Sequence, residues 1–293
     1  MSHMRHPQVF LVSCIYPLME FKEIAKGVKV PVIGLGTWGM GGGTFPNPFT
    51  DKQSIAALRH GIELGMTHID TAEMYASGHT EEVVGEAIKP FDREKLFITS
   101  KVLPKNFRYN DLIDAAKRSL KRLKIEQVDL YLLHWFNPDI PLKETMRAME
   151  YLLEQGLTRF IGVSNFSVEE MKEAQSHLDK KNKIVTNQVE YSLLEREPEK
   201  EVLPFCQKNK IILTAYSPFA HGKLVGKKIP MLDELAKKYN KTPAQIALNW
   251  LVSKDQVITI PKASDIKHVE ENAGAVGWKL NKEDTKKLDN LHI

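Results

Sequence analysis

Four polar residues that could share one reaction close or follow short apolar segments of this 293-residue chain. Asp70 closes the segment HID, and Tyr75 follows it by one loop turn. Lys101 closes the segment ITSK, and His134 closes LYLLH. Short apolar runs of this kind are typical of buried strands, and the carboxyl ends of parallel strands meet on one face. The spacing therefore predicts that a carboxylate, a phenol, an ammonium and an imidazole lie together.

These four groups suit a proton transfer to or from a small molecule. A tyrosine with its ordinary pKa of about 10 is a poor proton donor at neutral pH. An ammonium about 4 Å away favours tyrosinate by roughly 4 kcal/mol at an effective dielectric of about 20, on the order of three pKa units. We expect Lys101 to lower the pKa of Tyr75 in this way, while Asp70 keeps Lys101 charged. His134 would place or share the proton of a substrate oxygen.

Each of these residues also fits a structural role when it is taken singly. The aspartate and the lysine suit an ordinary ion pair at a strand end, the tyrosine a rim aromatic, and the histidine a polar cap. The joint arrangement favours a reaction site.

Eight short apolar segments are the predicted strands that would position these residues. They are rich in Val, Ile and Leu and are mostly apolar throughout, which is typical of parallel strands covered on both faces. The segments are Val32–Gly36, Thr67–Asp70, Leu96–Lys101, Val128–His134, Phe160–Val163, Ile184–Glu190, Ile211–Tyr216 and Val257–Ile260.

A helical pattern follows each predicted strand. Eight strands that alternate with helices predict an α/β fold, a (β/α)8 TIM barrel, with a doubly wound open sheet as the alternative. The predicted helices are Asp51–Leu64, Glu81–Ile88, Asn110–Leu123, Pro141–Gln155, Val168–Leu178, Glu197–Lys208, Met231–Tyr239 with Pro243–Val252, and Ile266–Ala273.

Further elements are predicted at both ends of the barrel. Phe21–Ile24 and Val28–Val30 flank a turn and predict a β-hairpin that caps the bottom of the barrel. Lys282–Leu291 predicts one short extra C-terminal helix. We interpret residues 19–293 as a single barrel domain, and residues 1–18 as a disordered extension, derived from a tag or an upstream start.

The string GLGTWG at residues 34–39 matches the dinucleotide fingerprint G-x-G-x-x-G. That fingerprint requires a helix to begin near its third glycine, whereas Gly39 is followed by MGGGTFPNPF, which cannot be helical. We therefore interpret Gly34, Gly36 and Gly39 as permitting tight backbone passage at a strand end, with Trp38 carried to the barrel mouth.

The charge and the cysteine content argue against several other classes of function. The 41 basic and 37 acidic residues give a net charge of +4 and are scattered along the chain, so no nucleic-acid partner is expected. Cys14 and Cys206 lack metal-ligand spacing, so neither a disulfide nor a metal site is expected. The apolar run Val9–Leu18 is short and lacks a cleavage pattern. We expect a cytoplasmic protein without a signal peptide or a membrane partner.

Several longer motifs occur in the order and approximate spacing of one enzyme family. They are GLGTWGMG, HIDTAEMYASGHTEEVVGEAI, FITSKV, DLYLLHW, GLTRFIGVSNFS, TNQVEYS, AYSPF and ITIPKASDIKHVEEN. From about Glu20 to its C-terminus the chain resembles the aldo-keto reductases. The resemblance implies that Tyr75 is the general acid toward a carbonyl oxygen while a nicotinamide delivers hydride to carbon. The implied catalytic tetrad is Asp70, Tyr75, Lys101 and His134.

The resemblance also implies which residues bind the cofactor. Hydroxyl and amide groups would hold the carboxamide and a tyrosine would stack on the nicotinamide ring, at Ser164, Asn165, Gln188 and Tyr216. The loop beside the pyrophosphate would begin with Ser217 and Phe219. The adenosine ribose with its 2′-phosphate and the adenine would meet Lys262, Ala263, Ser264, Glu271 and Asn272. The implied set is completed by Thr37, Trp38, Asp70 and His268.

One position departs from the family pattern and bears on the choice of cofactor. Many members carry an arginine six residues beyond the lysine that corresponds to Lys262, where this chain has His268. A histidine is not a permanent fork-shaped cation. We expect NADP(H) as the cofactor because Lys262 is retained, while use of NAD(H) stays open.

Aromatic residues are expected to form the substrate pocket. The walls would be Trp38 and Trp135 beside Tyr75 and His134, with Met40 or Phe136 as additions. The short C-terminal tail leaves no long loop to narrow the pocket, and the resemblance then implies broad aldehyde specificity. The expected partner is a small carbonyl compound or alcohol, and the protein is expected to be a monomer or a weak homo-oligomer.

We therefore expect NADPH-dependent, reversible reduction of aldehydes or ketones to alcohols. Two alternatives stay open at this point. The first is a non-catalytic regulatory barrel that binds the cofactor, and the second is a Schiff-base aldolase that uses Lys101 as its nucleophile.

Overall fold

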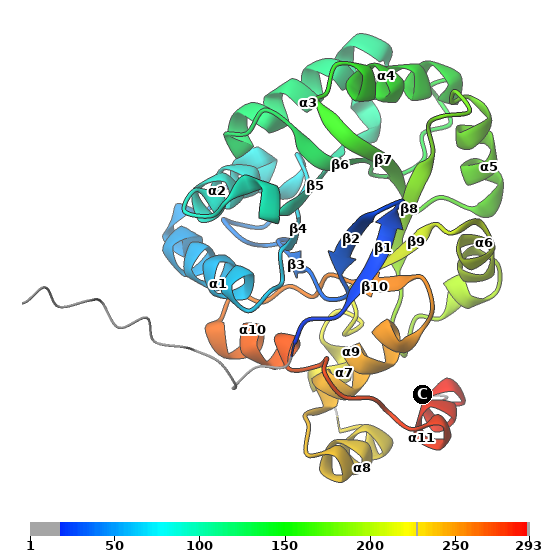
Figure 1. Cartoon of the computed structure of the whole chain (residues 1–293). Helices are drawn as coiled ribbons and strands as arrows, with labels where there is room; N and C mark the ends of the chain where they lie inside the picture. Colours follow the sequence, from blue (N-terminus) through cyan, green and yellow to red (C-terminus); the bar gives the residue numbers. More distant parts are fainter. Residues whose placement is uncertain (1–17, 227, 292–293) are drawn as a thin grey trace, which may run out of the picture.

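Parallel strands that follow one another in chain order form the wall of a barrel (Figure 1). The computed structural model describes residues 18–226 and 228–291. Within them, adjacent strands pair in parallel from β3 to β10, and parallel bridges from Ile33 to Thr259 and from Gly36 to Lys262 close the sheet. This closure confirms the predicted (β/α)8 barrel. The strands are β3 (Leu35–Gly36), β4 (His68–Asp70), β5 (Phe97–Val102), β6 (Val128–Leu133), β7 (Thr158–Ser164), β8 (Ile184–Glu190), β9 (Ile212–Tyr216) and β10 (Val257–Thr259).

Helices form a ring outside the strands (Figure 1). Their inner faces are apolar at helical spacing, as in α3, where Leu112, Ala116 and Leu123 are among the buried residues. The helices of the ring are α1 (Asp51–Glu63), α2 (His79–Ile88), α3 (Tyr109–Leu123), α4 (Leu142–Glu154), α5 (Val168–Ser176), α6 (Val202–Asn209), α9 (Pro243–Ser253) and α10 (Ile266–Ala273), and α8 (Pro230–Tyr239) packs on α9 outside the ring (Figure 1). A short helix that was not predicted, α7 (Lys223–Gly226), lies in the segment after β9.

The predicted helix Glu197–Lys208 is the one whose start differs most from the structure. A short 3-10 turn covers Glu197–Glu199, and α6 begins only at Val202. The reason is Pro204, which has no N–H to donate to the preceding turn. When the helix begins at Val202, Pro204 lies in its first turn, where no donor is required.

A β-hairpin closes the bottom of the barrel, and Figure 1 views the molecule from this side. Strands β1 (Phe21–Ala25) and β2 (Val28–Pro31) pair in antiparallel fashion, as predicted. Ile24 and Val30 pack with apolar residues of the strands, among them Leu130 of β6. The predicted extension, residues 1–18, lies outside the described residues except for Leu18.

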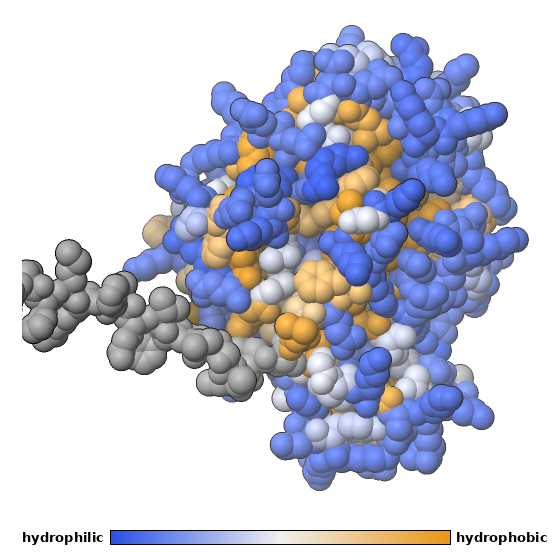
Figure 2. Space-filling view, viewed as in Figure 1, coloured by the Kyte–Doolittle hydropathy of each residue, from blue (hydrophilic) through white to orange (hydrophobic). Residues whose placement is uncertain are grey.

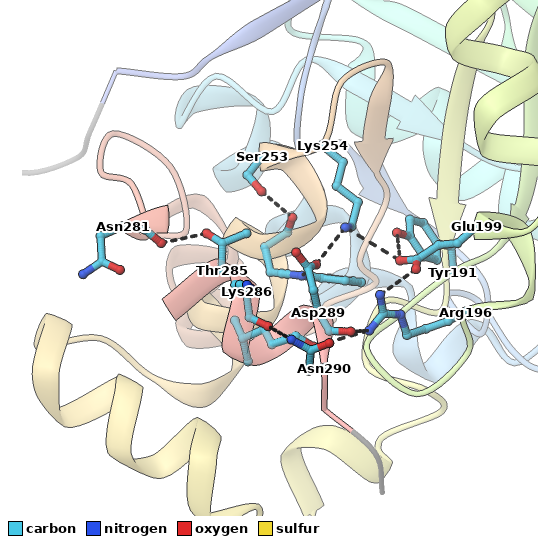
Figure 3. A network of polar contacts seen from close by, with 12 residues as sticks. Tyr191, Arg196, Glu199, Ser253, Lys254, Asn281, Thr285, Lys286, Asp289 and Asn290 are labelled. Carbon is cyan, nitrogen blue, oxygen red and sulfur yellow. Dashed lines mark hydrogen bonds and ion pairs between the residues drawn. The ribbon is translucent and has the colours of Figure 1, made fainter. Parts of the chain in front are cut away.

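The C-terminal helix α11 (Lys282–Asp289) is tied to the barrel by polar contacts (Figure 3). Oδ1 of Asp289 accepts hydrogen bonds from Trp250 Nε1 at 2.9 Å and from Lys254 Nζ at 3.1 Å. The backbone oxygen of the same residue accepts from Arg196 Nη1 at 2.5 Å. The extra helix is confirmed, and it ends two residues before the predicted boundary at Leu291.

Two glycines of the GLGTWG string allow close backbone contacts. A Cβ at Gly36 would lie 2.4 Å from the oxygen of Ile260, and one at Gly34 would lie 2.8 Å from the oxygen of His68. Gly39 has open space around it but a φ of +83°, a conformation that glycine adopts without strain. No helix begins at Gly39, since the next helical turn starts at Pro48. The structure thus agrees with the rejection of a dinucleotide fingerprint.

The surface seen from the hairpin side is largely hydrophilic, with apolar residues visible between the charged side chains (Figure 2). None of the helices in the described parts of the chain has the length and apolar character needed to cross a membrane.

Candidate active site

The predicted tetrad of Asp70, Tyr75, Lys101 and His134 lies together at the carboxyl ends of the strands. Asp70 is the last residue of β4, and Lys101 is the second-last residue of β5. His134 directly follows β6, and Tyr75 begins a 3-10 turn after β4. All four side chains are buried.

A buried ion pair holds the tyrosine hydroxyl. Lys101 Nζ lies 2.5 Å from Asp70 Oδ1 and donates to the backbone oxygen of Thr71 at 3.0 Å. It also lies 3.0 Å from Tyr75 Oη. The second oxygen of Asp70 accepts from Gln188 Nε2 at 2.7 Å. Burial alone would lower the pKa of Lys101, but Asp70 and Tyr75 outweigh it and leave the pKa raised, so the ammonium stays charged.

The expected lowering of the pKa of Tyr75 is wrong. Burial raises the pKa of its hydroxyl, and Asp70 adds to that rise, while Lys101 only partly opposes it. The cost of removing a phenolate from water outweighs its stabilisation by the ammonium. At neutral pH Tyr75 is therefore a protonated phenol beside a fixed cation.

His134 is a neutral imidazole at physiological pH. Burial lowers its pKa to about 2, and the charge of Lys101 acts in the same direction. Its ring stacks on that of Trp135 with centroids 3.9 Å apart and 12° between the planes. The Nδ1 atom is buried, and no hydrogen-bond partner for it occurs within residues 18–226 and 228–291. This residue can hold a hydrogen bond but does not carry a charge.

A cavity of about 770 Å³ opens above these residues. Trp38 and Trp135 lie in its wall as predicted, beside Tyr75 and His134. Met74 and His221 line it as well and were missed by the sequence reasoning. Met74 could have been found from its position next to Tyr75, whereas His221 lies in a loop whose path the sequence does not reveal.

The two suggested additions to this wall were wrong. Met40 is 1% exposed and belongs to the hydrophobic core. Phe136 packs edge-on against Phe166 with centroids 5.7 Å apart and is not among the residues that line the cavity.

One side of the same cavity carries the residues expected at a nicotinamide carboxamide. Ser164 Oγ donates to the backbone oxygen of Gln188 at 2.9 Å. Asn165 Nδ2 lies 3.0 Å from Ser164 Oγ, and Asn165 Oδ1 accepts from Tyr216 Oη at 2.9 Å. These bonds fix an array of amide and hydroxyl groups along one wall. Thr37, Ser217 and Phe219 also line the cavity.

A second cavity of about 550 Å³ lies beside the first and shares Phe219 and Lys262 with it. Its lining holds the remaining residues of the expected cofactor set, namely Ala263, Ser264, His268, Glu271 and Asn272. Lys262 is exposed at the junction, and partial burial lowers its pKa. Two joined cavities with amide groups at one end and a cation at the other suit the shape and charge of a phosphorylated dinucleotide.

The described residues contain no group of three or more His, Cys, Asp or Glu side chains arranged to hold a metal ion.

Comparison with known proteins places the whole barrel in one family. The Aldo/keto reductase family matches residues 32–293. Methylglyoxal reductase YeaE of Escherichia coli is 42% identical over 92% of this chain and 94% of its own length.

Two solved structures are similar in both sequence and fold. The thermostable aldo-keto reductase Tm1743, solved with the inhibitor epalrestat, has a TM-score of 0.89 at 47% identity, over 92% of this chain and 99% of its own. An aldo/keto reductase from Klebsiella pneumoniae, solved with NADP and acetate, has a TM-score of 0.84 at 39% identity, over 94% and 95% of the two chains. The chain described here therefore belongs to the aldo/keto reductase family of oxidoreductases.

Proposed function

We propose that this protein reduces small aldehydes and ketones to alcohols with NADPH, with Tyr75 as the general acid. The observation that carries the proposal is the 3.0 Å contact of Lys101 Nζ with Tyr75 Oη at the wall of a large cavity. This geometry and the family resemblance together support the roles of the four residues.

Proton transfer begins from a neutral Tyr75, because burial raises the pKa of its hydroxyl. The phenol donates its proton to the carbonyl oxygen as negative charge develops there. The phenolate left behind lies against the Lys101 ammonium, which Asp70 keeps charged. His134, as a neutral imidazole, holds the same substrate oxygen by a hydrogen bond. A reduced nicotinamide bound in the cavity supplies the hydride.

The polar wall of the cavity would orient the cofactor. Ser164, Asn165 and Gln188 offer donors and acceptors to a carboxamide, and the face of Tyr216 suits a flat heterocycle. Gln188 also bonds Asp70 at 2.7 Å, which links the cofactor wall to the catalytic ion pair. The NADP complex of the Klebsiella pneumoniae relative supports the dinucleotide assignment.

The 2′-phosphate of NADPH would lie at the second cavity, near Lys262 and His268. Lys262 provides the cation, and His268 replaces the fork-shaped donor that an arginine would offer. We infer a preference for NADPH with measurable use of NADH.

The substrate end of the cavity favours small, neutral carbonyl compounds. Trp38 and Trp135 form apolar walls, and Met74, which directly precedes Tyr75 in the sequence, lines the same cavity. Trp38 is 50% exposed, so the mouth stays open to side groups of varied size. The name of the Escherichia coli relative points to methylglyoxal as a first substrate to try.

The geometry argues against a Schiff-base aldolase. Such an enzyme needs a neutral amine that can reach a carbonyl carbon. Lys101 is fully buried, has a raised pKa, and directs its ammonium at Asp70, Thr71 and Tyr75.

The decisive experiment uses purified protein, NADPH and methylglyoxal, with nicotinamide absorbance as the readout. The parent protein should consume NADPH, and Tyr75→Phe should reduce kcat by about 10²-fold or more while NADPH binding stays unchanged. If Tyr75→Phe turned over as fast as the parent, Tyr75 would not be the acid. Borohydride trapping of the carbonyl compound on Lys101 would support the aldolase instead.

A further inference from the structure

The turn that carries Tyr75 has an unusual backbone. Ala76, Ser77 and Gly78 have φ values of 47°, 54° and 96°, so three consecutive residues lie in the left-handed region. For the two residues with a Cβ this conformation costs about 1–2 kcal/mol each. It persists only where the surrounding contacts hold it. The contacts that hold this turn also determine where Tyr75 lies.

The loop after β3 holds one side of the turn. The amide of Ala76 donates to the oxygen of Gly43 at 3.0 Å. Ser77 Oγ donates to the oxygen of Thr44 at 3.1 Å. These bonds attach the turn to the loop and leave its position relative to β5 to other contacts.

Arg122 of α3 supports the other side of the turn. A Cβ at Gly78 would lie 2.7 Å from Arg122 Nε and 2.9 Å from its Cδ, so this side chain occupies the space that glycine leaves free. Glu81 of α2 fixes the guanidinium, since its Oε2 accepts from Arg122 Nε at 2.7 Å and lies 2.6 Å from Nη2. Both nitrogens contact one carboxylate oxygen, which leaves the other oxygen for a different partner.

The second oxygen of Glu81 reaches the strand that carries Lys101. Its Oε1 accepts from Ser100 Oγ at 2.5 Å, and Ser100 directly precedes Lys101 in β5. The two helices approach closely here because Gly85 has no side chain, and a Cβ there would lie 2.7 Å from the oxygen of Leu123. Glu81 is fully buried.

Stability alone does not account for this buried pair. The cost of removing two charges from water largely offsets their attraction, so buried ion pairs stabilise folds weakly. Here the pair connects the two segments that hold Lys101 and Tyr75. Glu81 accepts a hydrogen bond from Ser100, the residue before Lys101, and Arg122 packs against the turn that follows Tyr75. We propose that Glu81 and Arg122 are positioning residues that set the 3.0 Å separation of Lys101 Nζ and Tyr75 Oη.

The first test measures this separation without catalysis. In protein labelled with [13Cζ]tyrosine, the NMR signal of Tyr75 is the one that Tyr75→Phe removes. Glu81→Gln should move this signal in the same direction as Lys101→Met does, because the ammonium no longer lies as close to the hydroxyl. An unchanged Tyr75 signal in folded Glu81→Gln protein would overturn the proposal.

Glu86→Gln is the matched control for this test. Glu86 lies in the same helix and pairs with Lys124 at the end of α3, but both side chains are partly exposed, and the pair involves neither Ser100 nor Arg122. The control should leave the Tyr75 signal unchanged. A shift of equal size in Glu86→Gln would mean that any α2–α3 ion pair affects the tyrosine, which would contradict a specific role.

The kinetic consequence rests on the proposed function. With NADPH and methylglyoxal, Glu81→Gln should lower kcat about 10-fold with little change in the KM for NADPH, since misplacement of a catalytic group slows chemistry. NADPH deuterated at the transferred position should show a larger isotope effect on kcat than in the parent. A loss of active protein would lower kcat without changing the isotope effect, and that result would contradict positioning. If the parent itself reduced no carbonyl compound, the proposed function would fail while the NMR result would still decide this inference.

Two further variants keep the proposal testable if Glu81→Gln does not fold. Arg122→Lys keeps the charge but removes the two-nitrogen contact, and it should shift the Tyr75 signal by part of the Lys101→Met shift. Ser100→Ala removes only the bond to β5 and should give a smaller shift. No shift in either folded variant would overturn the inference.

Discussion

A tyrosine, a carboxylate and a cation meet in two regions of this molecule, and the tyrosine has a different partner in each. At the barrel mouth Tyr75 Oη lies 3.0 Å from the Lys101 ammonium, and Asp70 binds that ammonium from the other side. The ammonium has no lone pair, so it must donate and the tyrosine oxygen must accept. The hydroxyl proton of Tyr75 remains free to face the cavity.

In the network that holds the C-terminal helix the tyrosine is the donor (Figure 3). Tyr191 Oη donates to Glu199 Oε1 at 2.6 Å, and Arg196 donates to the other oxygen of the same carboxylate at 2.5 Å. Burial raises the pKa of Tyr191, and its bond to Glu199 raises it further. The hydroxyl proton of Tyr191 is therefore held in a hydrogen bond to the Glu199 carboxylate.

The same three kinds of group, a phenol, a carboxylate and a cation, thus give the proposed proton donor in one region and a structural clamp in the other. The deciding feature is whether the cation or the anion touches the phenol. A cation stabilises the phenolate that remains after proton transfer, whereas an anion opposes its formation. Matched substitutions in the two regions test this contrast.

The largest expected effect comes from removing the lysine of each network. Lys101→Met leaves Asp70 buried without its cation, so unfolding free energy should fall by about 3–5 kcal/mol and turnover should be lost. Lys254→Met removes a cation that lies 3.1 Å from the half-exposed Asp289 and should cost no more than about 1 kcal/mol. Urea unfolding and NADPH-linked turnover of the two variants check this. Equal losses of stability would break the comparison.

The second effect comes from removing the tyrosine hydroxyl in each region. Tyr75→Phe should abolish most turnover while the protein stays folded, because Lys101 Nζ loses one acceptor but keeps Asp70 and the backbone oxygen of Thr71. Tyr191→Phe should keep turnover but lower the unfolding free energy by about 1.5–3 kcal/mol, the scale of a hydrogen bond to a charged group. Thermal unfolding and initial rates of both variants decide the matter. Loss of turnover in folded Tyr191→Phe protein would assign that region a catalytic role.

The third effect concerns Lys262, a cation that lies outside both the Tyr75 and the Tyr191 regions. If Lys262 meets the 2′-phosphate of NADPH, Lys262→Met should weaken NADPH by roughly 1.5–3 kcal/mol and leave NADH almost unchanged. Lys267→Met, in the first turn of α10, is the matched control and should change neither affinity. Fluorescence titration of the parent and both variants with NADPH and with NADH measures the six dissociation constants. Equal weakening of NADPH and NADH would remove the phosphate assignment.

The smallest expected effect is a difference in pH dependence. Burial would raise the pKa of Glu199 and Asp289, but their hydrogen bonds outweigh it and leave both lowered. A carboxylate whose folded-state pKa lies below its unfolded pKa adds stability that is fully present above the unfolded pKa and is lost as pH falls through the folded-state pKa. Lys101 has a raised pKa, so its contribution is lost only as pH rises past its unfolded value of 10.5. The contacts of Glu199 and Asp289 should therefore weaken in acid, and the Asp70–Lys101 pair should weaken in alkali.

Melting temperatures of the parent and of Asp289→Asn across pH check this difference. The gap between the two proteins should narrow as pH falls from about 5 to 3, because the parent loses the charge that the variant already lacks. A gap that stayed constant over this range would mean that the charge of Asp289 does not stabilise the clamp.

Several features of the fold were predictable because they depend on neighbours along the chain. Strand β8 and helix α10 have the predicted boundaries, Ile184–Glu190 and Ile266–Ala273. Apolar runs, capping residues and the 3.6-residue period act within a few residues, so their pattern is visible in the sequence. The later start of α6, at Val202 rather than Glu197, is also a local effect, because Pro204 has no N–H for a preceding helical turn.

The convergence of the strand-end residues could also be anticipated, because a parallel barrel brings all carboxyl ends to one face. Asp70, Lys101 and His134 were placed by this rule alone. The alternation of side chains along a strand indicates which face each of these side chains lies on, but it does not indicate how deeply the side chain is buried.

Tertiary structure alone decided the properties that depend on burial and on distant partners. The sequence placed a cation near Tyr75 and gave no measure of desolvation, so the direction of the pKa shift was predicted wrongly. Met40 was expected in the pocket but is buried in the core. The loop after β3 folds back on α2, where Thr80 Oγ1 donates to the backbone oxygen of Met40 at 2.7 Å. The hydrogen bond that Ser100 Oγ of β5 donates to Glu81 of α2 joins residues 19 positions apart in the sequence. Residue types and local order are properties of the chain, whereas dielectric environment and hydrogen-bond partners exist only once distant segments have packed together.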